Sequence, residues 1–308
     1  MDQGIEPQFT YSRLLFAFAR INCIATLIVG VVVADGPPIC HLAILANHSI
    51  IKMNWSGFGT ATHIAHKEHY STLMAQTPQS ASPLITIAGG SNSLIASVVE
   101  GSLVIHHWGS SAGSPASEVD LIKSLTQSIA HSDFDKKTWP GIFREHARGD
   151  LGSSALLGHR EGQDWSTRFE IVEIHNTVEK LSFIARDESA LLQIEGSFEF
   201  DQFGILRIDY QLLNQGDRYN LESLAYWLPL PHRAKERMDF TGRWAAERQV
   251  QRAGIDTGLW VRQSREGRSG HDFTIAQLAM ERTTNFSHGE VWSIALAWSG
   301  NSSHMIEK

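Results

Sequence analysis

The densest group of chemically capable side chains in this sequence is residues 144–150, which read Arg-Glu-His-Ala-Arg-Gly-Asp. Five of these seven residues can carry a charge or form hydrogen bonds through their side chains. Gly149 lies among them and permits a backbone bend with positive φ. Two interpretations stay open: His146, Arg148 and Asp150 contact a ligand, or the charged residues pair with one another and fix a loop.

Two other segments match catalytic patterns less well. Residues 109–113 fit the Gly-x-Ser-x-Gly pattern of a nucleophile elbow. A true elbow runs directly into its helix, whereas Ser114 and Pro115 intervene here before the helix that we expect at 116–129. A flexible Ser/Gly loop is therefore the better interpretation. His271-Asp272 could mimic a dyad, but nothing in the sequence ties it to a nucleophile.

The histidines at positions 63, 66 and 69 raise the question of a metal site. His63 and His66 would share one face of a helix, but His69 falls away from that face. No nearby cysteine or pair of carboxylates completes a site. The sequence also has no glycine-rich phosphate loop with a lysine. We therefore expect no metal and no cofactor.

The elements that must position these residues are β-strands. From about Leu84 onward, apolar and polar residues alternate, most clearly at 192–200 and 206–212. The turn residues 201–204 join these two runs, so they predict an antiparallel hairpin with one solvated face. The segment 292–298 alternates with small residues on its second face, so both of its faces could be covered. Further strands are expected at 169–174 and 181–185.

Many closely spaced strands without helical blocks between them predict a sandwich. The expected fold is all-β: a large antiparallel β-sandwich, or supersandwich, over residues 84–308. A short helical excursion at 116–129 and an irregular N-terminal extension complete the prediction.

Residues 1–83 are expected to form that atypical extension and a linker. The stretch 14–34 is almost entirely apolar, which fits a secretory signal or an anchor, but Arg20 interrupts it. Alternatively, translation begins at Met53 or Met74, and the preceding residues do not belong to the fold. Residues 76–83 have the composition of a linker, so we place the domain boundary there.

Charge and cysteine content narrow the class of protein. The net charge of -7 argues against nucleic acid as a partner, because such binding needs a basic face. The chain has only Cys23 and Cys40, so no disulfide framework holds the main domain together. A cytoplasmic location is the simpler prediction. The alternative is a secreted or membrane-anchored protein if residues 13–34 act as a signal or anchor.

Several short motifs occur in an order that resembles the N-terminal domain of glycoside hydrolase family 36 α-galactosidases (melibiases). The resemblance covers about residues 84–307. The motifs are His-Trp-Gly at 107–109, Arg-Gly-Asp at 148–150 running into Ser-Ala at 154–155, Gly-Arg-Trp at 242–244 with Glu-Arg at 247–248, Gly-Arg-Ser-x-His at 267–271, Gly-Glu-Val-Trp at 289–292 and Ser-Gly-Asn at 299–301.

The resemblance implies a retaining enzyme that hydrolyses terminal α-galactosides, such as melibiose or raffinose, in carbohydrate catabolism. In that family a (β/α)8 barrel follows the sandwich and holds both catalytic aspartates. Only seven residues follow Asn301 here, and the Lys-Trp-Asp motif of the nucleophile is absent. We therefore expect a fragment without catalytic residues that is inactive alone. Its partners would be the missing barrel, as a domain or a separate chain, and the galactoside bound by the complete enzyme.

The resemblance also gives residues 144–150 a role, because this region of the family domain approaches the sugar pocket, often across a subunit contact. His146 and Asp150 would then accept sugar hydroxyl hydrogens, Arg148 would lie in the same loop, and Trp139 would offer an apolar face. The internal ion-pair cluster remains the other interpretation. The alternatives for the whole chain are a free-standing galactoside-binding module and an oligomerisation domain, since the family forms homo-oligomers.

Overall fold

The computed structural model describes residues 23–35, 84–111, 141–273, 276–298 and 300–308. These ranges contain strands and one short 3₁₀-helix, η2 (His146–Arg148). The strands are β1 (Cys23–Asp35), β2 (Ile85–Gly89), β3 (Asn92–Val99), β4 (Ser102–Ser110), β5 (Leu156–His159), β6 (Glu170–Asn176), β7 (Lys180–Asp187), β8 (Leu192–Phe200), β9 (Leu206–Asn214), β10 (Asn220–Leu224), β11 (Glu236–Arg243), β12 (Ala246–Gly254), β13 (Leu259–Ser264), β14 (Ala276–Met280), β15 (His288–Ala297) and β16 (Ser302–Glu307).

The hairpin of β8 and β9 confirms the prediction from alternation. The two strands pair antiparallel, with Phe198 opposite Ile208, and both of these side chains are buried. In the turn, the Asp201 side chain accepts hydrogen bonds of 2.9 Å from the backbone N–H groups of Phe203 and Ile205. Gly204 has a φ of 82°, a conformation that favours glycine.

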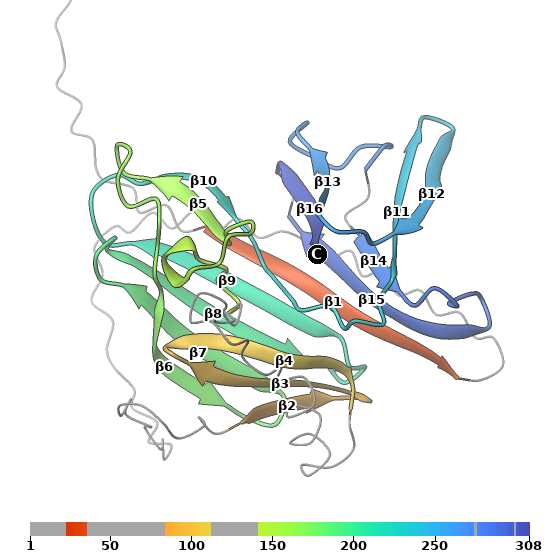
Figure 1. Cartoon of the computed structure of the whole chain (residues 1–308), viewed down its shortest axis with the longest axis horizontal. Helices are drawn as coiled ribbons and strands as arrows, with labels where there is room; N and C mark the ends of the chain where they lie inside the picture. The colour runs from red at the N-terminus through yellow and green to blue at the C-terminus, as the bar shows by residue number, and fades with distance from the viewer. Residues whose placement is uncertain (1–22, 36–83, 112–140, 274–275, 299) are drawn as a thin grey trace, which may run out of the picture.

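The main sheet has nine strands in the order β12-β11-β14-β15-β1-β9-β8-β7-β6. Every neighbouring pair runs antiparallel. The three-stranded sheet β2-β3-β4 lies against the β6–β9 side of the main sheet (Figure 1). The all-β sandwich expected from the sequence is therefore confirmed.

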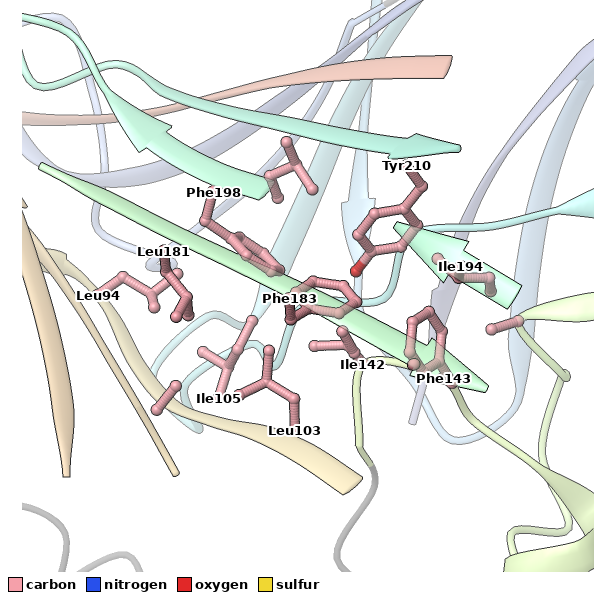
Figure 2. Packing of buried hydrophobic residues seen from close by; sticks show 14 of the residues in the cluster. Leu94, Leu103, Ile105, Ile142, Phe143, Leu181, Phe183, Ile194, Phe198 and Tyr210 are labelled. Atoms are coloured by element: carbon pink, nitrogen blue, oxygen red, sulfur yellow. The ribbon is translucent and has the colours of Figure 1, made fainter. Parts of the chain in front are cut away.

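The core lies between these two sheets (Figure 2). Phe183 of β7 is its centre, with ring centroids 5.8 Å from Tyr210 and 6.2 Å from Phe198. Leu103 of β4 packs in the same cluster from the opposing sheet. Gly196 of β8 pairs with Phe183, and a Cβ there would lie 2.2 Å from the Phe183 ring. The strand therefore needs glycine at this position for the ring to pack.

Strand β1 changes the expected domain organisation. Residues 1–83 were expected outside the sandwich, yet Cys23–Asp35 forms a strand in the middle of the main sheet. It pairs with β9, with Leu27 opposite Ile208, and with β15, with Leu27 opposite Leu296. An apolar run rich in Val and Ile suits a central strand as well as a signal segment, so its composition alone did not distinguish the two. The sheet thus extends beyond the boundary predicted at residue 83.

Two small ladders, β5–β10 and β13–β16, lie beside the main sheet. Among the described residues, no helix is long and apolar enough to span a membrane. The helix expected at 116–129, the linker at 76–83, the three histidines from 63 to 69, and Trp139 lie outside the described residues.

Candidate functional site

Residues 141–155 form a loop that two buried side chains hold to the core. Ile142 and Phe143 are each 2% exposed, and the Ile142 N–H donates to the Leu103 carbonyl at 2.9 Å. The chain then forms η2 and turns at Gly149, whose φ of 83° agrees with the bend predicted there. The loop closes where the Ala155 N–H donates to the Arg144 carbonyl at 2.9 Å.

Arg144 joins two carboxylates from distant parts of the chain, and we call Arg144, Asp150 and Glu307 the Arg144 cluster. The guanidinium donates to both Asp150 oxygens, at 2.9 and 3.0 Å, and to Glu307 of β16 at 2.8 Å. It also lies over the Trp227 ring, 4.6 Å from the centroid. The N–H groups of the guanidinium thus bind two carboxylates in its plane. One face of the guanidinium lies on the indole ring.

The Arg144 cluster sets the protonation of both carboxyl groups. Burial alone would raise the pKa of Asp150, but hydrogen bonds from Arg144 and the Gly152 N–H, with the Arg144 charge, lower it below its usual value. Burial likewise opposes ionisation of Glu307, and hydrogen bonds from Arg144 and Ser153 lower its pKa. Both groups are therefore anions at neutral pH.

Arg148 ties the same loop to the turn between β3 and β4 and to the residue before β6. It donates to the Glu145 carboxylate at 2.9 Å, to the Glu100 carbonyl at 2.7 Å and to the Phe169 carbonyl at 2.6 Å. Glu145 is 2% exposed and also accepts the Phe169 N–H at 2.7 Å. Burial raises the pKa of Glu145 to about 7, against the hydrogen bonds from Phe169 and Arg148 that lower it.

The structure does not gather the predicted site residues into one pocket. His146 is exposed, with Nε2 3.2 Å from the Gly152 carbonyl oxygen, and lines one cavity. Asp150 lines a different cavity. Arg148 and Asp150 are held in internal contacts, as the ion-pair interpretation expected. The sugar-contact role of Trp139, His146, Arg148 and Asp150 stays a prediction.

The cavity beside Asp150 has a volume of about 600 Å³ and was not foreseen from the sequence. Its floor comes from the cross-strand pairs Gln277–Ile294 and Ala279–Trp292 of β14 and β15. Its walls include Trp108 of β4 and Trp227. We call this space the indole cavity, since three tryptophans line it. Trp108 is buried, and its Nε1–H donates to the Pro229 carbonyl at 2.6 Å, as expected for a packed residue.

Sequence comparison places this chain beside known sugar-cleaving enzymes. A model of the glycosyl hydrolase family 36 N-terminal domain matches residues 101–308. An α-galactosidase from Escherichia coli is 33% identical over 184 residues, which are 59% of this chain and 26% of that protein. The chain therefore spans about a quarter of the length of this relative.

Solved structures share the fold. A variant of a family 36 α-galactosidase from Geobacillus stearothermophilus, in complex with raffinose, has a TM-score of 0.56 at 12% identity, over 72% of this chain and 39% of that chain. The α-galactosidase from Lactobacillus brevis has a TM-score of 0.54 at 12% identity, over 73% of this chain and 40% of that chain. At these identities the likeness concerns the fold alone.

Proposed function

We propose a function from one premise: the chain belongs to glycosyl hydrolase family 36, whose N-terminal domain it carries. These 308 residues are the non-catalytic portion of an α-galactosidase and do not hydrolyse substrate alone. The observation that supports this is the match over 101–308 to the N-terminal domain. The substrate class is a terminal α-galactoside, because the Escherichia coli relative is an α-galactosidase and the Geobacillus protein was solved with raffinose.

The carboxyl groups in and beside the loop 141–155 support a non-catalytic role. A retaining glycosidase needs one protonated acid and one carboxylate about 5–5.5 Å apart across the bond to be cleaved. Asp150 and Glu307 share Arg144, which together with other hydrogen bonds keeps the pKa of each below its usual value, so neither can donate a proton at neutral pH. Glu145, whose pKa is about 7, is buried against Arg148 and Phe169 and lines neither cavity.

Hydrolysis of a chromogenic α-galactoside by the purified chain tests this proposal. The host should lack its own α-galactosidase, and the matched control is the same preparation with Asp150→Asn. We expect no turnover above the buffer rate in either sample. Adding the remaining domains of the Escherichia coli relative in trans should then give activity if the sandwich docks. Turnover by the 308-residue chain alone would refute the proposal.

We also propose that the chain meets a partner surface near its site loop. Leu151, within the loop 141–155, is 94% exposed, and Trp165, whose ring centroid lies 6.3 Å from that of His146 in the loop, is 59% exposed. A catalytic barrel, as a domain or a separate chain, or a further copy of the chain would cover them. Sedimentation velocity should show self-association that Leu151→Ser with Trp165→Ser weakens; a strictly monomeric chain would count against it. A cytoplasmic location stays our proposal from the two-cysteine composition.

A further inference from the structure

The indole cavity holds polar groups that the protein itself leaves unused. Gln277 is 2% exposed, and both its amide nitrogen and its amide oxygen lack a hydrogen-bond partner among the described residues. The indole Nε1 of Trp227 is buried without a partner in the same way. Both residues line the cavity. Buried polar groups without partners are rare in folded proteins because each costs desolvation free energy.

The position of Gln277 in β14 places its side chain beside this space. Gln277 and Ala279 are two residues apart in β14, so their side chains lie on the same face of the sheet. Ala279 pairs with Trp292 and Gln277 pairs with Ile294, and all four residues line the cavity. The amide is thus a polar point in an otherwise apolar floor. Donor and acceptor together select an occupant that both accepts and donates hydrogen bonds.

The charges around the cavity balance one another. Arg144 donates to both Asp150 and Glu307, and Lys308 also lines the cavity. Two cations therefore face two carboxylates, and the Lys308 ammonium donates to the Ile255 carbonyl at 3.2 Å. These four side chains have no net formal charge together, so they favour neither an anionic nor a cationic ligand. A ligand without net charge needs no counter-charge from the cavity.

The remaining walls are apolar, formed by aliphatic side chains and by aromatic rings. Trp108 and Trp292 are 5% and 2% exposed, and Arg144 covers one face of Trp227. Broad apolar ring surfaces with a few placed polar groups, in a cavity of about 600 Å³, are typical of small-molecule sites. A pyranose ring has this complementary chemistry, since it carries hydroxyls that donate and accept and a face of C–H groups.

We propose that the indole cavity of the sandwich binds a neutral sugar, with Gln277 and the Trp227 Nε1–H as its hydrogen-bonding groups. The site lies within the N-terminal domain and needs no catalytic barrel. It is therefore independent of hydrolysis, although a galactoside is the natural first ligand to test given the proposed function.

Titration calorimetry of the purified chain with galactose and melibiose tests this proposal, with tryptophan fluorescence as a second readout. We expect saturable binding at millimolar sugar. Gln277→Leu removes both amide groups and should weaken binding about tenfold or more, as expected for two neutral hydrogen bonds. The matched control is Gln249→Leu, on the exposed β12, which should bind as the unchanged chain does. Trp227→Phe removes the Nε1–H together with part of the indole ring and keeps an aromatic side chain, so it provides a second test if the first variant fails to fold.

Two results would overturn the proposal: no saturable signal from folded chain, or equal binding by the unchanged chain, Gln277→Leu and Trp227→Phe. Binding of an apolar dye without any sugar binding would also overturn it. The outcomes are separable from those of the proposed function. Folded chain that neither cleaves nor binds sugar defeats this inference alone, whereas turnover by the 308-residue chain defeats the proposed function alone.

Discussion

Replacing Arg144 by methionine should destabilise the protein strongly, because Arg144 alone separates two carboxylates that are mostly buried. The Asp150 side chain is 12% exposed and that of Glu307 is 21% exposed. Removing one partner of a buried ion pair costs about 3–5 kcal/mol. Since both carboxylates keep some contact with water, we expect the lower end, about 3 kcal/mol at pH 7.

Urea unfolding at pH 7 and at pH 3 gives the magnitude and its cause. In the unchanged protein the lowered pKa values of Asp150 and Glu307 stabilise the fold above the usual carboxyl range, and this contribution is lost as the pH falls through the native values. In Arg144→Met the two anions repel one another, and protonation relieves the repulsion. The difference in the free energy of unfolding between the unchanged protein and Arg144→Met should therefore be smaller at pH 3 than at pH 7.

Neutralising the carboxylates provides the control. Arg144→Met combined with Asp150→Asn and Glu307→Gln removes the repulsion, so most of the lost stability should return. A loss below about 1 kcal/mol for the single variant, which is typical of exposed ion pairs, would refute the reasoning. So would a loss that is equal at pH 7 and pH 3.

Three further predictions follow from the fold. Burial raises the pKa of Glu145 from 4.5 to about 7, so its contribution to stability is fully present below pH 4.5 and is lost as the pH rises through 7. In urea unfolding we expect a loss of about 2 kcal/mol between pH 5 and pH 8, and Glu145→Gln should abolish this loss. Parallel pH profiles of the two proteins would contradict the prediction. Gly196→Ala should cost about 1–3 kcal/mol in urea unfolding by pressing on Phe183, and an unchanged midpoint would show that the ring moves freely. A chain begun at Met53 lacks β1, so light scattering should detect association through the open edges of β9 and β15. A chain lacking only residues 1–22 keeps β1 and should have the same molar mass in solution as the full chain. A monomeric Met53 product would argue against the pairing of β1.

The sandwich was predictable because alternation is a local signal. Residues 192–200 and 206–212 carry the period of a half-buried strand and a turn between them, and the structure pairs them as expected. The strand at Cys23–Asp35 was not predicted as part of the sheet. An apolar run of this kind is compatible with a signal, an anchor or a central strand, and only its pairing partners decide.

The ion pairs of the loop 144–150 were predicted in part. The charged loop 144–150 was singled out, and so was the internal pairing of its charges, because polar residues at this density must either face water or satisfy one another. Glu307 could not be assigned to the same cluster, since it lies 163 residues after Arg144. No prediction from the sequence concerned Gln277, which the structure shows to be buried. Its burial depends on segments from elsewhere in the chain that cover that face of the sheet, which local sequence does not reveal.

The nine-stranded sheet consists of two four-stranded parts that no ladder joins directly in the described residues. β9 to β6 form one part, β15 to β12 form the other, and β1 supplies the pairing on both sides. If the β1 pairing opens, the two parts lose their shared backbone hydrogen bonds at once. Amide hydrogen exchange should therefore show the two parts as separate cooperative units. The more strongly the amides of β1 are protected from exchange, the more closely the opening of one part should follow that of the other.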